Sequence, residues 1–209
     1  MSRKKFEFTT DTKVVFGRKL FRIKALISFG NVTAGDLGGY VEKEENLSHD
    51  GDAWVYGNAE VYGNAEVSGD ARVYGDARVS GDAWVYGNAE VYGNAEVYGN
   101  ARVYGNAEVY GNAEVYGNAR VYGDAWVSGD AWVSGDADYL CFKGLGSFNR
   151  NTTFFKCKDG HIHVSCGCFS GNLEEFENKV KETHGDSKYA KEYLACMEVV
   201  KIHFEVQNE

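Results

Sequence analysis

The residues best suited to metal or nucleophilic chemistry lie in the last third of this 209-residue chain. Thiolates and imidazoles are preferred zinc ligands, and this part of the chain holds enough of both for a zinc site. The candidates are Cys141, Cys157, Cys166, Cys168, Cys196, His161, His163, His184 and His203. However, no Cys-x-x-Cys pair occurs among them, so their number alone is weak evidence for a metal.

Strand periodicity over residues 161–168 gives these groups a simpler interpretation. On a strand, Cys166 and Cys168 share one face with two aliphatic residues, whereas His161 and His163 occupy the opposite face. Because an unpaired cysteine behaves as a small hydrophobe, we expect the cysteines to be buried and structural and these two histidines to be solvated. The sequence therefore predicts no catalytic residue, no bound metal and no cofactor.

Charged and aromatic residues in the middle of the chain could instead form a contact surface. Tyr and Arg are enriched at protein interfaces, so one hypothesis is that a basic face docks on an acidic face of a second copy or of a partner. The same residue types also suit exposed strand positions, and recent duplication of a repeat would produce them without selection at each site. The binding candidates are Glu90, Glu96, Arg102, Glu108, Glu114, Arg120, Tyr92, Tyr98, Tyr104, Tyr110, Tyr116 and Tyr122.

These residues belong to a repeat that runs from Gly51 to Ser134. It consists of fourteen uninterrupted hexads of the form Gly-(Asn or Asp)-Ala-x-Val-(Tyr or Ser), followed by a degenerate fifteenth over residues 135–139. Alternation places Ala and Val inside and x and Tyr or Ser outside, while Gly with Asn or Asp permits a corner. Residues 87–104 and 105–122 are identical, which indicates three hexads, or 18 residues, per coil. The pattern predicts a mainly β fold, a triangular parallel β-helix.

Residues 18 apart are expected to stack in adjacent coils, so the variable position forms three ladders on the outer surface. Two faces are then acidic in the middle and the third is basic, and stacked like charges are expected to be unfavourable. The ladders are Trp54, Arg72, Glu90, Glu108, Trp126; Glu60, Arg78, Glu96, Glu114, Trp132; and Glu66, Trp84, Arg102, Arg120, Asp138.

The repeat resembles that of the hexapeptide-repeat, left-handed parallel β-helix proteins, in which Val55, Val61 and Val67 would fill the aliphatic position. The left-handed sense is implied by this resemblance, and right-handed triangular solenoids such as the bactofilins stay an alternative. The family includes coenzyme A acyltransferases and zinc-dependent carbonic anhydrases, which use histidines near the coils. Residues 51–160 contain no His and no inserted loop, so we expect a protein that is not an enzyme.

Residues 1–50 are expected to form an N-terminal β-hairpin cap and the first coil. Residues 14–16 and 20–27 have strand character around Gly17. Residues 22–59 resemble the opening of YdcK-like bacterial hexapeptide proteins, a family without an assigned activity. That resemblance is carried by Ala34-Gly35, Gly38-Gly39-Tyr40-Val41, Asn46-Leu47-Ser48 and Gly51-Asp52-Ala53-Trp54-Val55.

After the repeat of residues 51–138, residues 139–209 predict a small α+β domain of order ββαα. Two strands flank a turn at Asp159-Gly160, and two helices follow. Asn172 with Glu175 three residues later indicates a capping box that begins the first helix. The predicted strands are 152–158 and 161–169, and the predicted helices run from Asn172 to about His184 and from Asp186 or Ser187 to about Phe204.

Charge is distributed unevenly along the chain. The formal net charge is −9, and residues 51–138 hold four Arg against fourteen Asp or Glu, so direct binding to nucleic acid is not expected. Residues 1–30 are basic, and their cations are expected to be solvated unless an acidic partner binds them. The cations concerned are Lys4, Lys5, Arg18, Lys19, Arg22 and Lys24. Without a signal peptide or a long apolar run, and with an odd number of cysteines, we expect a cytoplasmic protein with reduced thiols and no membrane contact.

The segment of residues 166–194 resembles a small domain of uncharacterised phage and prophage proteins, which implies an origin in a bacterium or a phage-infected host cell. The sequence thus predicts a non-enzymatic scaffold or binding module that forms homo-oligomers or binds a host protein. One alternative is a viral inhibitor of a host defence or nucleic-acid enzyme, acting as an acidic mimic or by sequestering a small ligand. Another is a divergent acyltransferase whose base is His161, His163 or His184.

Overall fold

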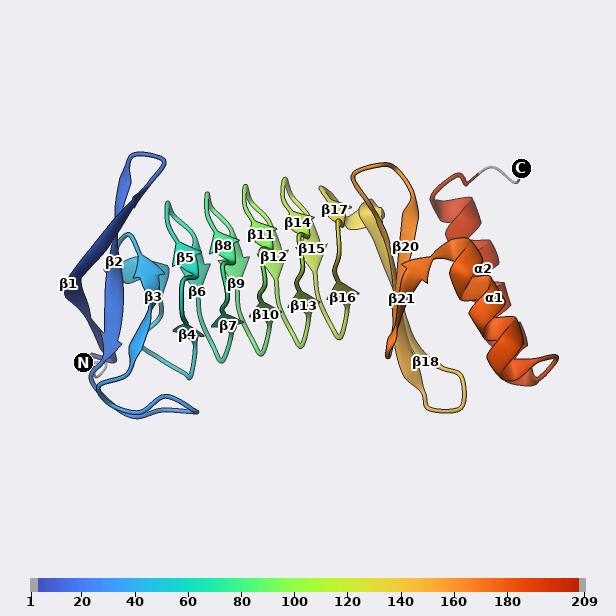
Figure 1. Cartoon of the computed structure of the whole chain (residues 1–209), viewed down its shortest axis with the longest axis horizontal. Helices are drawn as coiled ribbons and strands as arrows, with labels where there is room; N and C mark the ends of the chain where they lie inside the picture. Colours follow the sequence, from blue (N-terminus) through green and yellow to red (C-terminus); the bar gives the residue numbers. More distant parts are fainter. Residues whose placement is uncertain (1–3, 207–209) are drawn as a thin grey trace.

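The molecule is a rod of stacked coils closed at both ends by other elements, as the computed structural model of the chain shows (Figure 1). The structure describes residues 4–206. A β-solenoid of about five turns occupies residues 40–133, with an N-terminal strand region before it and a domain of strands and two helices after it. The predicted mainly β fold with 18-residue coils is therefore confirmed.

Each hexad contributes a two-residue strand whose Val points inward. The Ala and Val of all fourteen hexads are at most 1 % exposed, so the core is a continuous column. The Gly that opens each hexad has a φ of 58–76° from Gly51 to Gly129, the left-handed region that favours glycine. The strands are β4 (Trp54–Val55), β5 (Glu60–Val61), β6 (Glu66–Val67), β7 (Arg72–Val73), β8 (Arg78–Val79), β9 (Trp84–Val85), β10 (Glu90–Val91), β11 (Glu96–Val97), β12 (Arg102–Val103), β13 (Glu108–Val109), β14 (Glu114–Val115), β15 (Arg120–Val121), β16 (Trp126–Val127) and β17 (Trp132–Val133).

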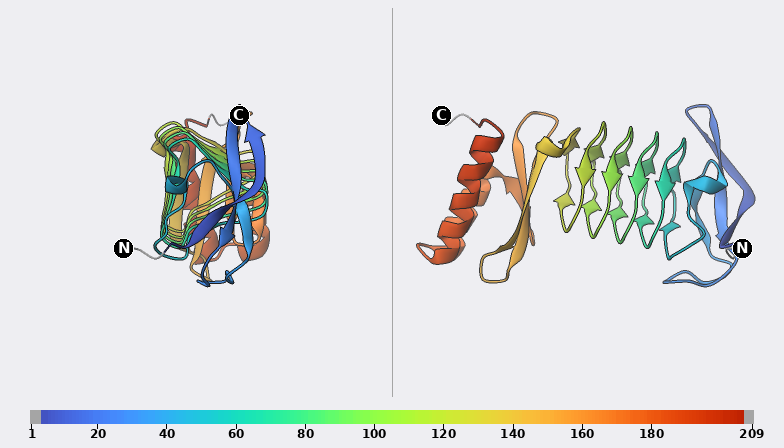
Figure 2. Two further views of the ribbon diagram at one scale, coloured as in Figure 1. Left: turned by 90° about the vertical axis from the view of Figure 1, so that its left-hand side faces the viewer. Right: turned by 180° about the vertical axis from the view of Figure 1, so that it is seen from behind.

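Parallel pairing between residues 18 apart builds three sheets, one for each side of the triangle. Glu90 pairs with Glu108, Glu96 with Glu114 and Arg102 with Arg120, as the predicted ladders require. Viewed along the axis, the coils superimpose on one another (Figure 2). The strand orders are β4-β7-β10-β13-β16 for the first side, β5-β8-β11-β14-β17 for the second and β6-β9-β12-β15 for the third.

An antiparallel hairpin continues the second sheet beyond the first coil. The strands are β1 (Phe6–Val15), β2 (Arg18–Ala25) and β3 (Leu37–Val41), and a 3₁₀ turn, η1 (Glu44–Asn46), follows. β3 is antiparallel to β2 and parallel to β5, so it joins the hairpin to the rod. The predicted hairpin is confirmed, with a first strand longer than the expected residues 14–16.

The C-terminal domain places a four-stranded sheet between the rod and two helices (Figure 1). Its elements are β18 (Tyr139–Leu145), β19 (Arg150–Lys156), β20 (Ile162–Cys166), β21 (Phe169–Asn172), α1 (Leu173–His184) and α2 (Lys188–His203). Phe155 and Tyr139 pack into the core of the rod, whereas Phe154 packs with Phe176 beneath the helices. The predicted α+β domain, with a hairpin followed by two helices, is confirmed, and β18 and β21 extend that hairpin on both sides. Both helix starts are confirmed, with Asn172 and Ser187 as the N-caps.

The degenerate fifteenth hexad does not form a coil strand. Residues Asp136–Asp138 form a 3₁₀ turn, η2. The carboxylate of Asp138 accepts hydrogen bonds from the backbone N–H groups of Ser134 and Gly135, and it forms an ion pair with Lys156. The expectation that Asp138 extends the third ladder was therefore wrong, because its side chain closes the end of the last coil.

A helix that spans a membrane needs sufficient length and hydropathy. Neither α1 nor α2, nor any other helix within residues 4–206, is long and apolar enough to cross a bilayer.

Candidate functional site on the outer faces of the rod

The glutamates of the two acidic faces are neutralised in part by neighbours in their own ladders. The hydroxyl groups of Tyr74 and Tyr92 donate to the carboxylates of Glu90 and Glu108, each at 2.8 Å. Arg72 Nη1 also lies 3.4 Å from Glu90 Oε1. Each carboxylate thus faces a donor as well as the like charge of the next coil, which offsets the expected repulsion.

The second face repeats this arrangement. Tyr98 donates its hydroxyl to Glu114 at 2.8 Å, and Arg78 lies 2.9 Å from Glu96. Lys158 from the C-terminal domain also pairs with Glu114, and the hydrogen bond from Lys158 is the leading cause of the lowered pKa of that carboxyl.

The tyrosines stack as parallel rings along the rod. Ring centroids are 4.7 Å apart for Tyr74 and Tyr92, 4.9 Å for Tyr92 and Tyr110, and 5.1 Å for Tyr98 and Tyr116. Burial, followed by the hydrogen bond to glutamate, raises the pKa of Tyr74, Tyr92 and Tyr98 well above the usual 10. These hydroxyl groups therefore stay protonated as donors at neutral pH.

The third face differs in how its cations are paired. Within residues 4–206, neither Arg102 nor Arg120 forms an ion pair, and both side chains are exposed. Arg102 lies 5.1 Å above the ring of Trp84, whose exposed fraction is 46 %. Tyr86, Tyr104 and Tyr122 stack beside them. We call this surface the arginine face, defined by Trp84, Tyr86, Arg102, Tyr104, Arg120 and Tyr122.

Most basic residues of the N-terminal hairpin pair within the chain. Arg18 lies 3.0 Å from Glu42, Arg22 lies 3.3 Å from Asp11, and Lys4 lies 3.2 Å from Glu44. Lys5 is 1 % exposed, so the expectation that this cation is solvated was wrong.

The cysteines and histidines divide between different environments. Cys157 and Cys166 are buried, Cys141 and Cys196 are partly buried, and Cys168 is exposed. The predicted burial of Cys168 was wrong, because β20 ends at Cys166 and Gly167, with a φ of 60°, turns the chain.

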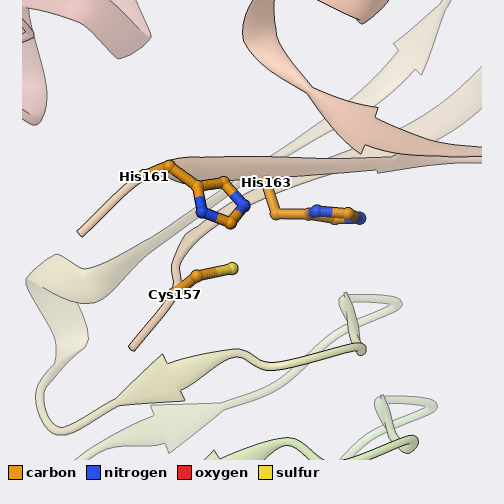
Figure 3. A group of neighbouring side chains, drawn as sticks. All are labelled: Cys157, His161 and His163. Atoms are coloured by element: carbon orange, nitrogen blue, oxygen red, sulfur yellow. The ribbon is translucent and has the colours of Figure 1, made fainter. Parts of the chain in front are cut away.

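The structure brings Cys157, His161 and His163 together, with one ligand atom from each within 4.8 Å of the others (Figure 3). His161 is exposed as predicted, but His163 is half-buried, and its pKa is lowered first by burial and then by the charge of His161. Burial raises the pKa of the Cys157 thiol to about 11. The predicted strand faces put Cys166 with Cys168 and did not bring Cys157 together with the two histidines.

His184 lies elsewhere, on the helix-covered side of the sheet. Its ring stacks on Tyr193 at 5.7 Å. Both residues line a cavity of about 250 Å³ together with Arg150, Cys166 and Phe176. His161 and His163 do not line this cavity, so the three histidines considered as alternative bases do not form one site.

Comparison with known proteins agrees with the architecture of the rod. A family model described as the YdcK beta solenoid repeat matches residues 71–87, 95–111 and 113–129. The match begins at residue 71 and therefore lies beyond residues 22–59, over which the sequence was expected to resemble this family. A search of curated proteins found no match. The chain is therefore similar to the YdcK solenoid repeats over the coils that carry the tyrosine, glutamate and arginine ladders.

Proposed function

We propose that the protein is a non-enzymatic assembly module in which the arginine face of one copy binds an acidic face of a second copy. The observation that carries this proposal is the unpaired state of Arg102 and Arg120 within residues 4–206, on a chain whose formal net charge is −9.

Association is expected to occur side by side. The open end of a solenoid offers unpaired backbone groups to another chain, but here the hairpin covers one end and the four-stranded sheet covers the other (Figure 1). The lateral faces are left as the surfaces where copies can meet.

The chemistry of the arginine face favours an acidic partner surface. Arg, Tyr and Trp are the residues that contribute most to interface energies, and arginine pairs with carboxylates through several donors. Glu90 and Glu96 lie on the two acidic faces, and each stacks on a glutamate of the next coil just as Arg102 stacks on Arg120. Two antiparallel or parallel rods can therefore bring cations and carboxylates into register.

The size of the surface indicates a modest affinity. The arginine face spans the three strands β9, β12 and β15, roughly 10–15 Å along the axis. An interface of this extent is at the small end for stable complexes, so we expect association to weaken as salt screens the ion pairs.

The same proposal includes a phage or prophage origin and action in the cytoplasm of the bacterial host. It is supported by the resemblance of residues 166–194 to a small phage domain. A host protein with an acidic surface is the other partner that this chemistry would suit.

The test is the subunit number of a charge-reversed variant. Native mass spectrometry of the wild-type chain is expected to give multiples of 23.1 kDa, and Arg102→Glu combined with Arg120→Glu is expected to give the monomer. Light scattering after size exclusion at low and high salt would measure the same change in solution.

A matched control changes the net charge equally at a distant place. Lys188→Glu with Lys191→Glu, at the start of α2, is expected to leave the oligomer intact. A monomeric wild-type chain, or an oligomer that survives reversal of both arginines, would exclude this interface.

A further inference from the structure

The hairpin that covers the last coil places a thiol and two imidazoles on one face. In the antiparallel pairing of β19 with β20, Phe155 lies opposite His163 and Lys156 lies opposite Ile162. The backbone N–H of Cys157 donates to the carbonyl of His161 at 2.9 Å, so these two residues lie opposite each other at the turn. Residues opposite each other, or two apart on a strand, share a face, and this puts Cys157, His161 and His163 on the same side.

The ligand atoms of these side chains are close to the spacing that a metal requires. One atom from each lies within 4.8 Å of the others, and the thiol and both rings gather beside the hairpin (Figure 3). Zinc bonds of about 2.3 Å to sulfur and about 2.0 Å to nitrogen place tetrahedral ligands roughly 3.3–3.6 Å apart. A closure of about an ångström by side-chain rotation would complete three bonds.

Each imidazole already has a hydrogen-bonding contact at one of its two nitrogens. The carboxylate of Asp159 contacts Nδ1 of His161, which leaves Nε2 with its lone pair. The hydroxyl of Ser170 lies 2.8 Å from Nε2 of His163, and when it accepts a hydrogen bond from that nitrogen, Nδ1 keeps its lone pair for a metal. A carboxylate that holds the far nitrogen of a ligating histidine is a common outer partner in zinc sites, and it fixes both the tautomer and the ring orientation.

We propose that Cys157 Sγ, His161 Nε2 and His163 Nδ1 bind a divalent transition metal of the zinc class. Thiolate with imidazole is a ligand set that suits zinc or cobalt and disfavours magnesium and calcium. His161 is exposed at the rim of the hairpin, so a water molecule could reach the metal as a fourth ligand. The metal would cross-link the end of β19 to the start of β20, where the C-terminal domain meets the rod.

Cobalt titration tests the proposal directly. Chain reduced and freed of metal is titrated with Co²⁺, and we expect one ion per chain with an absorption band from thiolate-to-cobalt charge transfer. Zn²⁺ is expected to displace the cobalt and abolish the band. Native mass spectrometry with Zn²⁺ alone is expected to add one zinc per chain, whatever the subunit number.

Variants assign the ligands. Cys157→Ser is expected to abolish the band, and Asp159→Asn, which leaves all three ligands in place, is expected to weaken affinity by about 10-fold or more. Cys168→Ser and His184→Gln remove an exposed thiol and an imidazole outside the group and are expected to leave the titration unchanged. Circular dichroism checks that each variant is folded.

Three outcomes would overturn the proposal. They are a folded wild-type chain that binds no cobalt, a thiolate band that persists in Cys157→Ser, and a band that disappears in Cys168→Ser. An unchanged affinity in Asp159→Asn would contradict the assignment of His161 Nε2. None of these results depends on how copies of the chain associate.

Discussion

The backbone groups that lack a partner from an adjacent coil are carbonyls at the first end of the rod and N–H groups at the other. At the first coil, the carbonyls of Gly51 and Ala53 have no coil before them, and both accept from the buried ammonium of Lys5, at 3.2 and 2.9 Å. At the last coil, the backbone N–H groups of Arg120 and Trp126 have no coil after them. They donate to the side chains of Asp136 at 2.9 Å and Thr153 at 3.0 Å.

Each end therefore needs side chains of a particular kind. Carbonyls require donors, and the amide of Asn46 supplies a further one to Gly63 and Ala65. Backbone N–H groups require acceptors, and the carboxylate of Asp138 supplies one to Ser134. A buried backbone group without a partner is costly, so each cap is specific to its end of the solenoid.

The largest effect is expected from removing the apolar part of the C-terminal closure. Phe155 is fully buried against the core of the rod, and Phe155→Ala is expected to lower the free energy of unfolding by about 3–5 kcal/mol. Urea denaturation measures the loss. Phe148→Ala, at a side chain 77 % exposed, is the control and is expected to change little. Equal losses in the two variants would show that the C-terminal closure does not depend on this packing.

Breaking the polar closure at the other end is expected to cost less. Lys5→Met preserves most of the volume but leaves the carbonyls of Gly51 and Ala53 without their donor. We expect a loss of about 1–3 kcal/mol in total, because the substitution also removes the cost of burying the ammonium. Lys191→Met, on the exposed side of α2, is the matched control. If both variants unfold at the same urea concentration, the ammonium of Lys5 does not close the first coil.

The contribution of each end to the free energy of unfolding is also expected to depend on pH, over a different pH range at each end. Burial lowers the pKa of Lys5 from 10.5 to about 8, so the folded chain binds fewer protons than the unfolded chain between these values. Stability therefore rises with pH through this window, by at most about 1.4 kcal/mol per pH unit.

At the C-terminal end, burial opposes ionisation of Asp138, but hydrogen bonds from Ser134 and Lys156 outweigh it and lower the pKa below 3.8. The stability that this carboxylate contributes is complete above the unfolded value and is lost as the pH falls below it. Unfolding of the wild-type chain, Lys5→Met and Asp138→Asn across pH separates the windows. If the two variants differ from wild type over the same pH range, Lys5 and Asp138 do not account for separate pH dependences of the two ends.

The smallest effect is expected on the faces between the ends. Tyr92→Phe removes the hydroxyl that donates to Glu108 and is expected to cost about 1 kcal/mol. Tyr110 stacks on Tyr92, but among the described residues its hydroxyl has no hydrogen-bond partner, so Tyr110→Phe is the control. Thermal unfolding of both variants measures the difference, and identical midpoints would mean that these hydrogen bonds do not stabilise the ladders.

Much of the rod was predictable because its structure follows from a sequence pattern that is local and periodic. The identity of residues 87–104 and 105–122 specifies the coil length, and the register of every ladder strand follows from it. The start of α1 was predictable for a similar reason, since Asn172 and Glu175 form their capping box within a single turn of chain.

The parts that were missed depend on contacts between distant segments. β18 has no alternating pattern and forms because β19 pairs with it. The grouping of Cys157 with His161 depends on the register of a hairpin. A two-residue turn at Asp159-Gly160 would place residue 158 opposite residue 161, whereas the structure places Cys157 opposite His161, so the predicted hairpin was one residue out of register. Gly167 was the available signal that the strand ends before Cys168.

The stacking of one coil on the next also determines how the two caps are oriented about the axis. A Cβ on Gly93 would lie 3.0 Å from the backbone nitrogen of Gly111, so successive corners must stay aligned. Inserting 18 residues would lengthen the rod by about 4.8 Å and preserve the angle between the caps. Inserting one hexad would rotate the C-terminal domain by about a third of a turn relative to the hairpin. Whole coils are therefore the unit in which this chain can grow or shrink without changing the direction in which its two ends face.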